Sequence, residues 1–394
     1  TNTLFLAFII CRTIWESLDF ETMILHAHLL FSYPLTMFMK EIILGGLVFV
    51  FIIYFSWKFL KTSLLISLII TFVYGYKNAY FIFSENNLFK NEYIIPHISA
   101  AKKTKNIIVI SLESFEEALT FDDVTGSENL FPKLTDLKKE GVTFTGYKEI
   151  QKIASYTLPS FYAKNCGIAS RADNLDILKS EEYREYARYP GKKCISDILK
   201  NMGYSVYFIM GGELTDEGAK NFFELHPISW AYGRLELEKL GYHKPKNFSH
   251  IPDGDLYDMA KKILNQNNGS PFALYIVTAN THFPEKGGHW IEEQCQSKYD
   301  DVRDAYRCLD KITYDFIKWC KSQPWYENTV IYLMGDHLAH ANYRVFNWEK
   351  HFTYREIYNL LLNSGYHGSI HKEFTLVDFA PTFLESMGFT VQKF

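Results

Sequence analysis

Two apolar runs near the start of the chain contain no charged residue. They cover residues 42–57 (IILGGLVFVFIIYFSW) and 62–76 (TSLLISLIITFVYGY). Each is slightly shorter than the roughly 20 residues that span a bilayer, but Trp, Tyr and Lys at the ends extend it. The alternative is a pair of buried helices in a soluble core, which usually carry a polar stripe that these runs lack. The pattern therefore predicts membrane spans at 42–57 and 62–77.

The connection between the two runs, residues 58–61 (KFLK), is short and basic. By the positive-inside rule it faces the cytoplasm, so the chain beyond about residue 83 is expected to be extracytoplasmic. The expected membrane region, residues 1–82, also includes a partial span at 1–11 and an interfacial or re-entrant helix at 23–39. Because the chain begins with Thr1 at the edge of an apolar stretch, we expect a fragment that lacks earlier spans.

From about residue 104, short apolar runs alternate with longer amphipathic segments. This alternation predicts an α/β fold whose sheet is mostly parallel and is covered by helices on both faces. The domain is expected to cover residues 106–394, after a polar linker at 83–105. The expected strands are 106–112, 204–210, 272–278 and 329–334, and the expected helices are 132–140, 194–202, 256–266 and 301–321.

The cysteines agree with an oxidising compartment. Four of the six fall into two local groups, which predicts the disulfides Cys166–Cys194 and Cys295–Cys308. Cys320 is then left single and Cys11 lies near the membrane. The absence of CxxC spacing argues against a zinc–thiolate site, and the net charge of −4 is too small to indicate a nucleic-acid partner.

Polar residues follow three of the expected strands. Glu113 follows the first, His282 follows the third, and Asp336 and His337 follow the fourth. In open α/β sheets the chemistry lies beyond the carboxyl ends of the strands, and carboxylates with an imidazole suit Mn²⁺, Zn²⁺ or Mg²⁺. Taken singly, each carboxylate is better explained as a helix cap and His282 as a core histidine. Their shared placement favours a metal site.

The stretch 154–163 (ASYTLPSFYA) predicts a turn that opens into a helix. Thr157 is either the helix cap or a nucleophile, and this stretch alone favours the cap.

Four motifs in order make a more specific pattern. The segments NIIVISLES, ASYTLPSFYAKNCGI, TANTHFP and WYENTVIYLMGDH resemble the alkaline-phosphatase/sulfatase superfamily. Within it they are most similar to membrane-anchored phosphoglycerol transferases, which include the glucan phosphoglycerol transferase I enzymes and, more distantly, the lipoteichoic acid synthases. The resemblance covers roughly residues 104–389 and the preceding spans, and it implies an alkaline phosphatase/sulfatase-like fold.

The resemblance also implies roles for individual residues. Glu113, Asp336 and His337 would bind a divalent metal together with Thr157, which would be the nucleophile. Mn²⁺ is the expected ion, with Zn²⁺ and Mg²⁺ as alternatives. His282 matches a histidine that contacts the substrate phosphate, and Asn221 is a candidate contact to the head group.

One departure from the pattern affects the expected substrate. Lipoteichoic acid synthases carry His-Gly-Asp after the strand that matches residues 204–210, whereas this chain has Met210-Gly-Gly-Glu213. The missing histidine favours the glucan-modifying branch.

The resemblance implies transfer of phosphoglycerol from phosphatidylglycerol to a periplasmic glucan or other surface glycan. The reaction would pass through a phospho-threonine, in the periplasmic domain of a multi-pass protein of a bacterial inner membrane. A phosphoethanolamine transferase is the main alternative. A sulfatase is disfavoured because Thr-Leu-Pro-Ser-Phe lacks the oxidisable residue and the Arg of sulfatases. A non-catalytic membrane protein is disfavoured because the ligand residues are all present.

Overall fold

The computed structural model describes residues 96–100, 104–126, 128–149, 156–168, 192–215, 218–282, 289–339, 345–348 and 355–393. The expected membrane region, with its two spans at 42–57 and 62–77, lies outside these residues. Within the described ranges, no helix is both long enough and apolar enough to cross a membrane.

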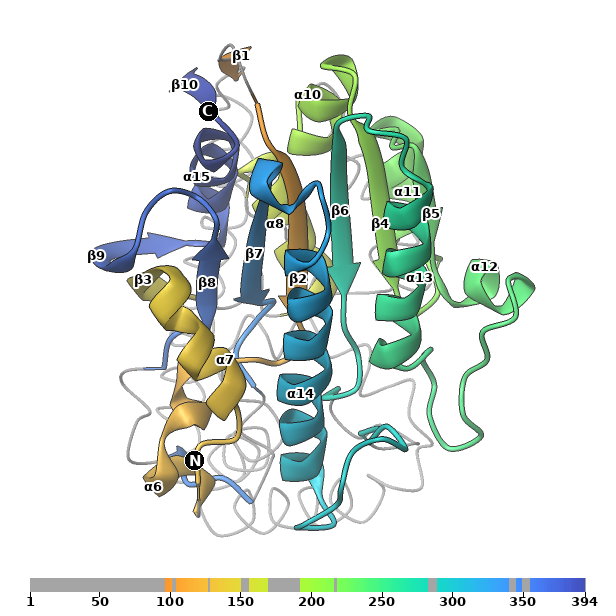
Figure 1. The fold of residues 1–394 in the computed structure, drawn as a ribbon, viewed down its shortest axis with the longest axis vertical. Helices are drawn as coiled ribbons and strands as arrows, with labels where there is room; N and C mark the ends of the chain where they lie inside the picture. Colours follow the sequence, from red (N-terminus) through yellow and green to blue (C-terminus); the bar gives the residue numbers. More distant parts are fainter. Residues whose placement is uncertain are drawn as a thin grey trace, which may run out of the picture. The chain divides into compact units, whose positions relative to one another are not determined.

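An eight-stranded sheet forms the centre of the compact unit Ile95–Phe394. The order of its strands is β5–β4–β6–β2–β7–β8–β3–β9 (Figure 1). Every neighbouring pair is parallel except the two that β8 makes, with β7 and with β3. The predicted mostly parallel sheet is therefore confirmed. The strands are β2 (Asn106–Leu112), β3 (Gly141–Lys148), β4 (Ser205–Met210), β5 (Trp230–Tyr232), β6 (Phe272–Val277), β7 (Thr329–Gly335), β8 (Asn359–Leu362) and β9 (Gly368–Thr375).

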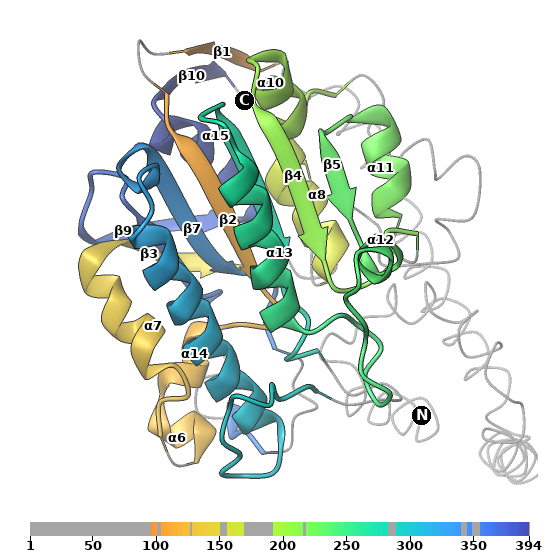
Figure 2. The same ribbon diagram turned by 45° about the vertical axis from the view of Figure 1, so that its right-hand side comes forward.

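Helices cover both faces of this sheet (Figure 1, Figure 2). On one face, α7, α13 and α14 share a core with Ile108 and Ile110 of β2; on the other, α8, α10 and α15 share a core with Ile107 and Val109. Successive side chains of a strand point to opposite faces, so a wholly apolar strand feeds both cores. The helices are α6 (Asp122–Thr125), α7 (Pro132–Leu137), α8 (Thr157–Cys166), α10 (Ile195–Asn201), α11 (Ala219–Leu225), α12 (Arg234–Lys239), α13 (Asp253–Gln266), α14 (Val302–Lys321) and α15 (Phe379–Ser386), with 3₁₀ turns η2 (Glu117–Thr120), η3 (Lys138–Glu140), η5 (Tyr326–Asn328) and η8 (Leu376–Asp378).

A separate two-stranded ribbon joins the two ends of the described chain. Strand β1 (His97–Ala100) pairs antiparallel with β10 (Phe389–Lys393). Strand β1 lies in the segment that the sequence assigned to a linker, residues 83–105, so the folded unit includes the end of that segment.

Both predicted disulfides are present in the structure. Cys166, the last residue of α8, is bonded to Cys194, which directly precedes α10. Cys295 is bonded to Cys308 of α14. Cys320, also on α14, is a buried cysteine that forms no disulfide. A disulfide stabilises a fold mainly by restricting the unfolded chain. The first of these bonds links the end of α8 to the start of α10.

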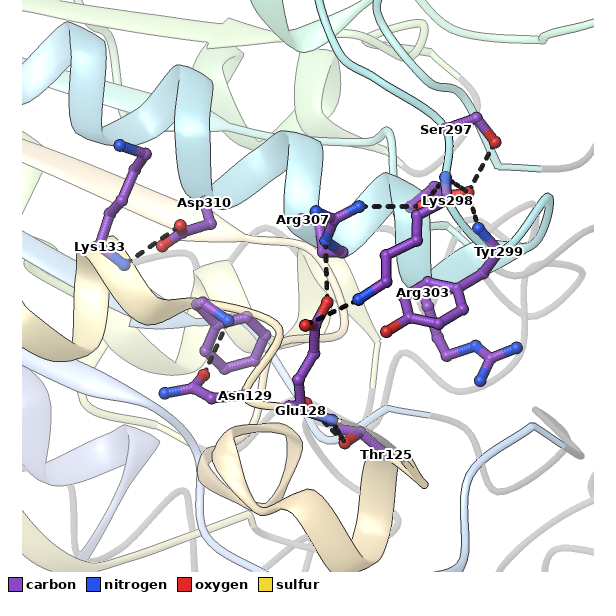
Figure 3. A network of polar contacts seen from close by, with 12 residues as sticks. Thr125, Glu128, Asn129, Lys133, Ser297, Lys298, Tyr299, Arg303, Arg307 and Asp310 are labelled. Atoms are coloured by element: carbon purple, nitrogen blue, oxygen red, sulfur yellow. Dashed lines mark hydrogen bonds and ion pairs between the residues drawn. The ribbon is translucent and has the colours of Figure 1, made fainter.

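A polar network fastens the start of α14 to the segment before α7 (Figure 3). Glu128 accepts a hydrogen bond of 2.9 Å from Lys298 Nζ and lies 3.2 Å from Arg307 Nε. The carboxylate of Asp304 accepts backbone N–H groups from residues 298–300. The disulfide-bonded loop before α14 is thereby held in place.

Gly335, the last residue of β7, allows two backbone segments to approach closely. A Cβ atom at this position would overlap the carbonyl oxygen of Phe115 and lie 2.9 Å from Ile357 Cγ2. We expect Gly335→Ala to lower the free energy of unfolding by about 2–4 kcal/mol, because the backbone must shift. Thermal or urea unfolding measures this. Gly126→Ala is the matched control: its φ is +77° with nothing within 4 Å of the added Cβ, so strain alone costs about 1 kcal/mol. Equal losses in the two variants would contradict the steric explanation.

Candidate active site

Four polar side chains meet where the central strands end. Glu113 directly follows β2, and Asp336 and His337 directly follow β7. These two strands are parallel and in register up to their last residues. The acids therefore leave the sheet at the same level, and Thr157, the first residue of α8, completes the group.

The side chains of this group are in contact. Thr157 Oγ1 donates a hydrogen bond of 2.9 Å to Glu113 Oε2. His337 Nε2 lies 3.4 Å from Glu113 Oε1 and 3.5 Å from Asp336 Oδ2. Glu113, Asp336 and His337 are all buried. The structure thus brings together the four residues that the sequence predicted as ligands.

Hydrogen bonds orient the imidazole and one carboxylate. His337 Nδ1 lies 2.9 Å from the carbonyl oxygen of Leu338, which can only accept, so Nδ1 carries a proton and Nε2 faces the carboxylates. Asp336 Oδ1 accepts backbone N–H groups from Ser114 and His337 at 2.9 and 2.7 Å. In the described part of the chain, the buried Asp336 Oδ2 has no hydrogen-bond partner. An oriented imidazole nitrogen and a buried oxygen lacking a partner are donors that a metal ion uses.

The charges of the group depend on one another. Burial raises the pKa of Asp336 to about 7, and the charge of Glu113 adds to this. Burial opposes ionisation of Glu113 too, but His337 holds the pKa of Glu113 well below its usual value. Burial likewise opposes charging of His337, but the two carboxylates raise its pKa to about 10. The buried carboxylates therefore need a positive charge beside them, which an imidazolium or a divalent cation can supply.

The donor set fits a divalent cation. One ligand atom from each of Glu113, Asp336 and His337 lies within 4.8 Å of the others. Carboxylate and imidazole donors suit Mn²⁺, Zn²⁺ and Mg²⁺. A second described group, Cys194, Asp197 and His226, has similar spacing, but the sulfur of Cys194 is in a disulfide.

Thr157 is not the cap of α8. The N-cap is Tyr156, whose backbone is extended, and no side chain caps the helix. The Thr157 hydroxyl instead points to Glu113. One turn later, the Ser160 hydroxyl donates to the backbone carbonyl oxygen of Asp336. The start of α8 is therefore fixed to both strand ends, with its first N–H groups beside the cluster.

The sequence did not reveal three groups that support the cluster. Lys164 donates a 3.1 Å hydrogen bond to Ser111, and burial lowers the pKa of Lys164 to about 8 despite the opposing charges of both acids. Glu149 accepts the N–H of Leu338 at 2.9 Å, and burial raises the pKa of Glu149 to about 7. Ser114 has a positive φ of 53° and donates its hydroxyl to Glu113 at 2.7 Å. Only Lys164 had a sequence signal, because it lies two helical turns from Thr157.

The other two predicted residues differ in their placement. His282 follows β6, which lies next to β2, and it acts on the pKa of Glu113 in the same lowering direction as His337. Its ring centroid is 5.3 Å from that of His250, a residue that the sequence did not indicate. Asn221 lies on α11, and no hydrogen bond among the described residues joins it to the cluster. Its contact to a head group stays a prediction.

The sequence is similar to those of known proteins. The sulfatase family profile matches residues 105–389. Phosphoglycerol transferase I of Escherichia coli O127:H6 is 30% identical over 247 residues, which are 60% of this chain and 31% of that protein. The chain thus spans about a third of the length of this relative.

Two solved structures show the same fold. One is a protein of the alkaline phosphatase superfamily from Vibrio parahaemolyticus, with a TM-score of 0.57 and 21% identity over 74% of this chain and 69% of that one. The other is the lipoteichoic acid synthase LtaP from Listeria monocytogenes, with a TM-score of 0.56 and 17% identity over 74% and 76%. Since the family profile covers most of the chain and the fold agrees with it, the chain belongs to the sulfatase family.

Proposed function

We propose that this chain transfers a phosphoglycerol group from phosphatidylglycerol to a periplasmic glucan or other surface glycan. The observation that carries the proposal is the Thr157 hydroxyl, held at the start of α8 and 2.9 Å from a buried carboxylate of the metal-binding cluster. The 30% identity to a phosphoglycerol transferase I supports this choice of transferred group.

A divalent cation is part of the proposal. Glu113, Asp336, His337 and Thr157 would hold it, with Mn²⁺ the expected ion. When bound, such an ion lowers the pKa of a coordinated hydroxyl and offsets charge on phosphoryl oxygens. The buried acids, which need a positive charge, support this assignment.

The first half of the reaction forms a covalent phospho-threonine. Thr157 Oγ1 loses its proton to water and attacks phosphorus, and the bond from phosphorus to the diacylglycerol oxygen breaks. His282 gives a proton to that departing oxygen. The N–H groups at the start of α8, a helix of ten residues, face the phosphate and favour its negative charge.

The second half reverses these steps with a new alcohol. A glycan hydroxyl gives its proton to His282 and attacks phosphorus, while the bond from phosphorus to Thr157 Oγ1 breaks. Thr157 then takes a proton from water. Phosphoglycerol has moved from lipid to glycan, and the enzyme is unchanged.

The location proposed is the periplasmic side of a bacterial inner membrane. The two disulfides support an oxidising compartment. The membrane spans at 42–57 and 62–77 remain part of this proposal.

Removing the nucleophile tests the covalent step. We expect Thr157→Ala to lower diacylglycerol release from labelled phosphatidylglycerol at least about a thousandfold, because no oxygen remains to attack phosphorus. Thr157→Ser, which keeps a hydroxyl, should retain measurable turnover. Thr382→Ala removes a hydroxyl that donates to the backbone carbonyl of Asp378, just before α15, and it should leave turnover within about twofold. Undiminished turnover in Thr157→Ala would rule out Thr157 as nucleophile.

Metal binding has a readout that does not depend on activity. Mn²⁺ should raise the melting temperature of the parent chain, because a ligand that binds only the folded state stabilises it. We expect Asp336→Asn to abolish this rise and, without metal, to unfold no earlier than the parent, because it removes a buried carboxylate. Asp315→Ala, which removes an exposed acid on α14, should keep the full rise. A full rise in Asp336→Asn would contradict the ligand assignment.

The transferred group can be identified by mass spectrometry of surface glycans from cells with and without the full-length protein. We expect a mass difference of one or more phosphoglycerol groups, which depends on Thr157. Turnover of phosphatidylethanolamine vesicles should be much slower than that of phosphatidylglycerol vesicles. A mass difference of phosphoethanolamine would instead establish the main alternative.

A further inference from the structure

A second histidine lies beside the candidate active site. His250 is in the segment between α12 and α13, and its ring centroid is 5.3 Å from that of His282. The backbone of the next residue, Ile251, donates a 2.9 Å hydrogen bond to the carbonyl oxygen of Gly211 at the end of β4. Strands β4 and β6 are paired, so His250, held beside the end of β4, lies next to His282, which follows β6.

The two glycines after β4 make room for this segment. A Cβ atom on Gly212 would lie 3.2 Å from His250 Cδ2 and 3.4 Å from His250 Nε2, and a Cβ on Gly211 would lie 2.6 Å from the carbonyl oxygen of Ile251. Real Cβ atoms rarely approach this closely. The sequence has no histidine at the end of β4, and the structure brings one there from a distant segment.

The chemistry of His250 suits a neutral, hydroxyl-bearing group. The ring is half-buried, with Nδ1 2.9 Å from the Ser249 hydroxyl. Burial, together with the charge of His282, lowers the pKa of His250 to about 4, so the imidazole is neutral at neutral pH. With Nδ1 bonded to Ser249, Nε2 is the nitrogen left to form one hydrogen bond with an alcohol, which can donate or accept.

Charged and aromatic side chains lie near the His250 ring. The charge of Arg234 acts on the pKa of His250 in the same direction as His282, and the charge of Glu113 acts against both. The Phe248 ring lies 5.4 Å from the His250 ring and 6.0 Å from the Trp290 ring. Phe248 is buried, so these rings place aromatic carbon directly beside the His250 imidazole.

His282 interacts electrostatically with both Glu113 and His250. A phosphate beside Glu113 and His282 therefore has its attached group within reach of His250. We infer that His250 is a specificity-determining residue that hydrogen-bonds the glyceryl hydroxyls of the transferred group. This inference rests on the proposed phosphoglycerol transfer and identifies a residue that recognises the head group.

The test compares two phosphodiesters on the full-length protein. One is phosphatidylglycerol in vesicles, followed by diacylglycerol release; the other is bis(p-nitrophenyl) phosphate, which has no glycerol. We expect His250→Ala to lower kcat/KM for phosphatidylglycerol about tenfold more than for bis(p-nitrophenyl) phosphate, as for loss of one hydrogen bond to a substrate hydroxyl. His250→Gln, which keeps a donor and an acceptor, should recover part of this ratio.

His243→Ala is the matched control, because His243 is exposed in the same segment. It should change both activities by less than about twofold. An equal proportional loss of both activities in His250→Ala, or no loss of either, overturns the head-group assignment alone. A parent protein that cleaves bis(p-nitrophenyl) phosphate but not phosphatidylglycerol overturns the proposed function and this inference together.

Discussion

The close approach of two buried carboxylates at one sheet edge is the constraint on which the site depends. Glu113 and Asp336 are brought together because β2 and β7 are adjacent, parallel and in register to their ends. Like charges in a buried place repel each other, and nearby positive groups must offset this repulsion. Two neighbouring groups can supply this positive charge: His337 faces both acids, and the buried Lys164 of α8 interacts with both. Much of the local sequence thus serves to keep two negative charges in one place.

The central part of the fold could be predicted from the sequence, and the edge could not. Strands β2, β4, β6 and β7 are the four expected strands, with ends that agree within one or two residues. They could be recognised because strands covered on both faces are continuous apolar runs. The strands beyond β7 give a weaker signal: the edge strand β9 is largely exposed, with the sequence GSIHKEFT, and β8 is buried but has only four residues. The reversal of direction at β8 depends on tertiary pairing, which no local pattern encodes.

The candidate site divides in a similar way. Glu113, Asp336 and His337 could be found because strand ends of a parallel sheet converge, and Thr157 because of its motif. His250 and Glu149 could not, since His250 lies in the segment between α12 and α13 and Glu149 follows β3, a strand that the sequence did not predict. The cap interpretation of Thr157 was wrong, because local composition cannot show that a hydroxyl points away from its own helix toward another strand. For Asn221, position along the chain was the sole guide.

The bond between Cys166 and Cys194 makes the anchoring of the candidate site depend on the redox state of its compartment. It joins the far end of the helix that begins with Thr157 to the start of α10. A newly made chain in a reducing environment lacks this link, so α8 is held there by packing and hydrogen bonds alone. In an oxidising compartment the disulfide adds a covalent anchor at the end of this helix. In the proposed periplasmic location, this anchoring would therefore be complete only after export.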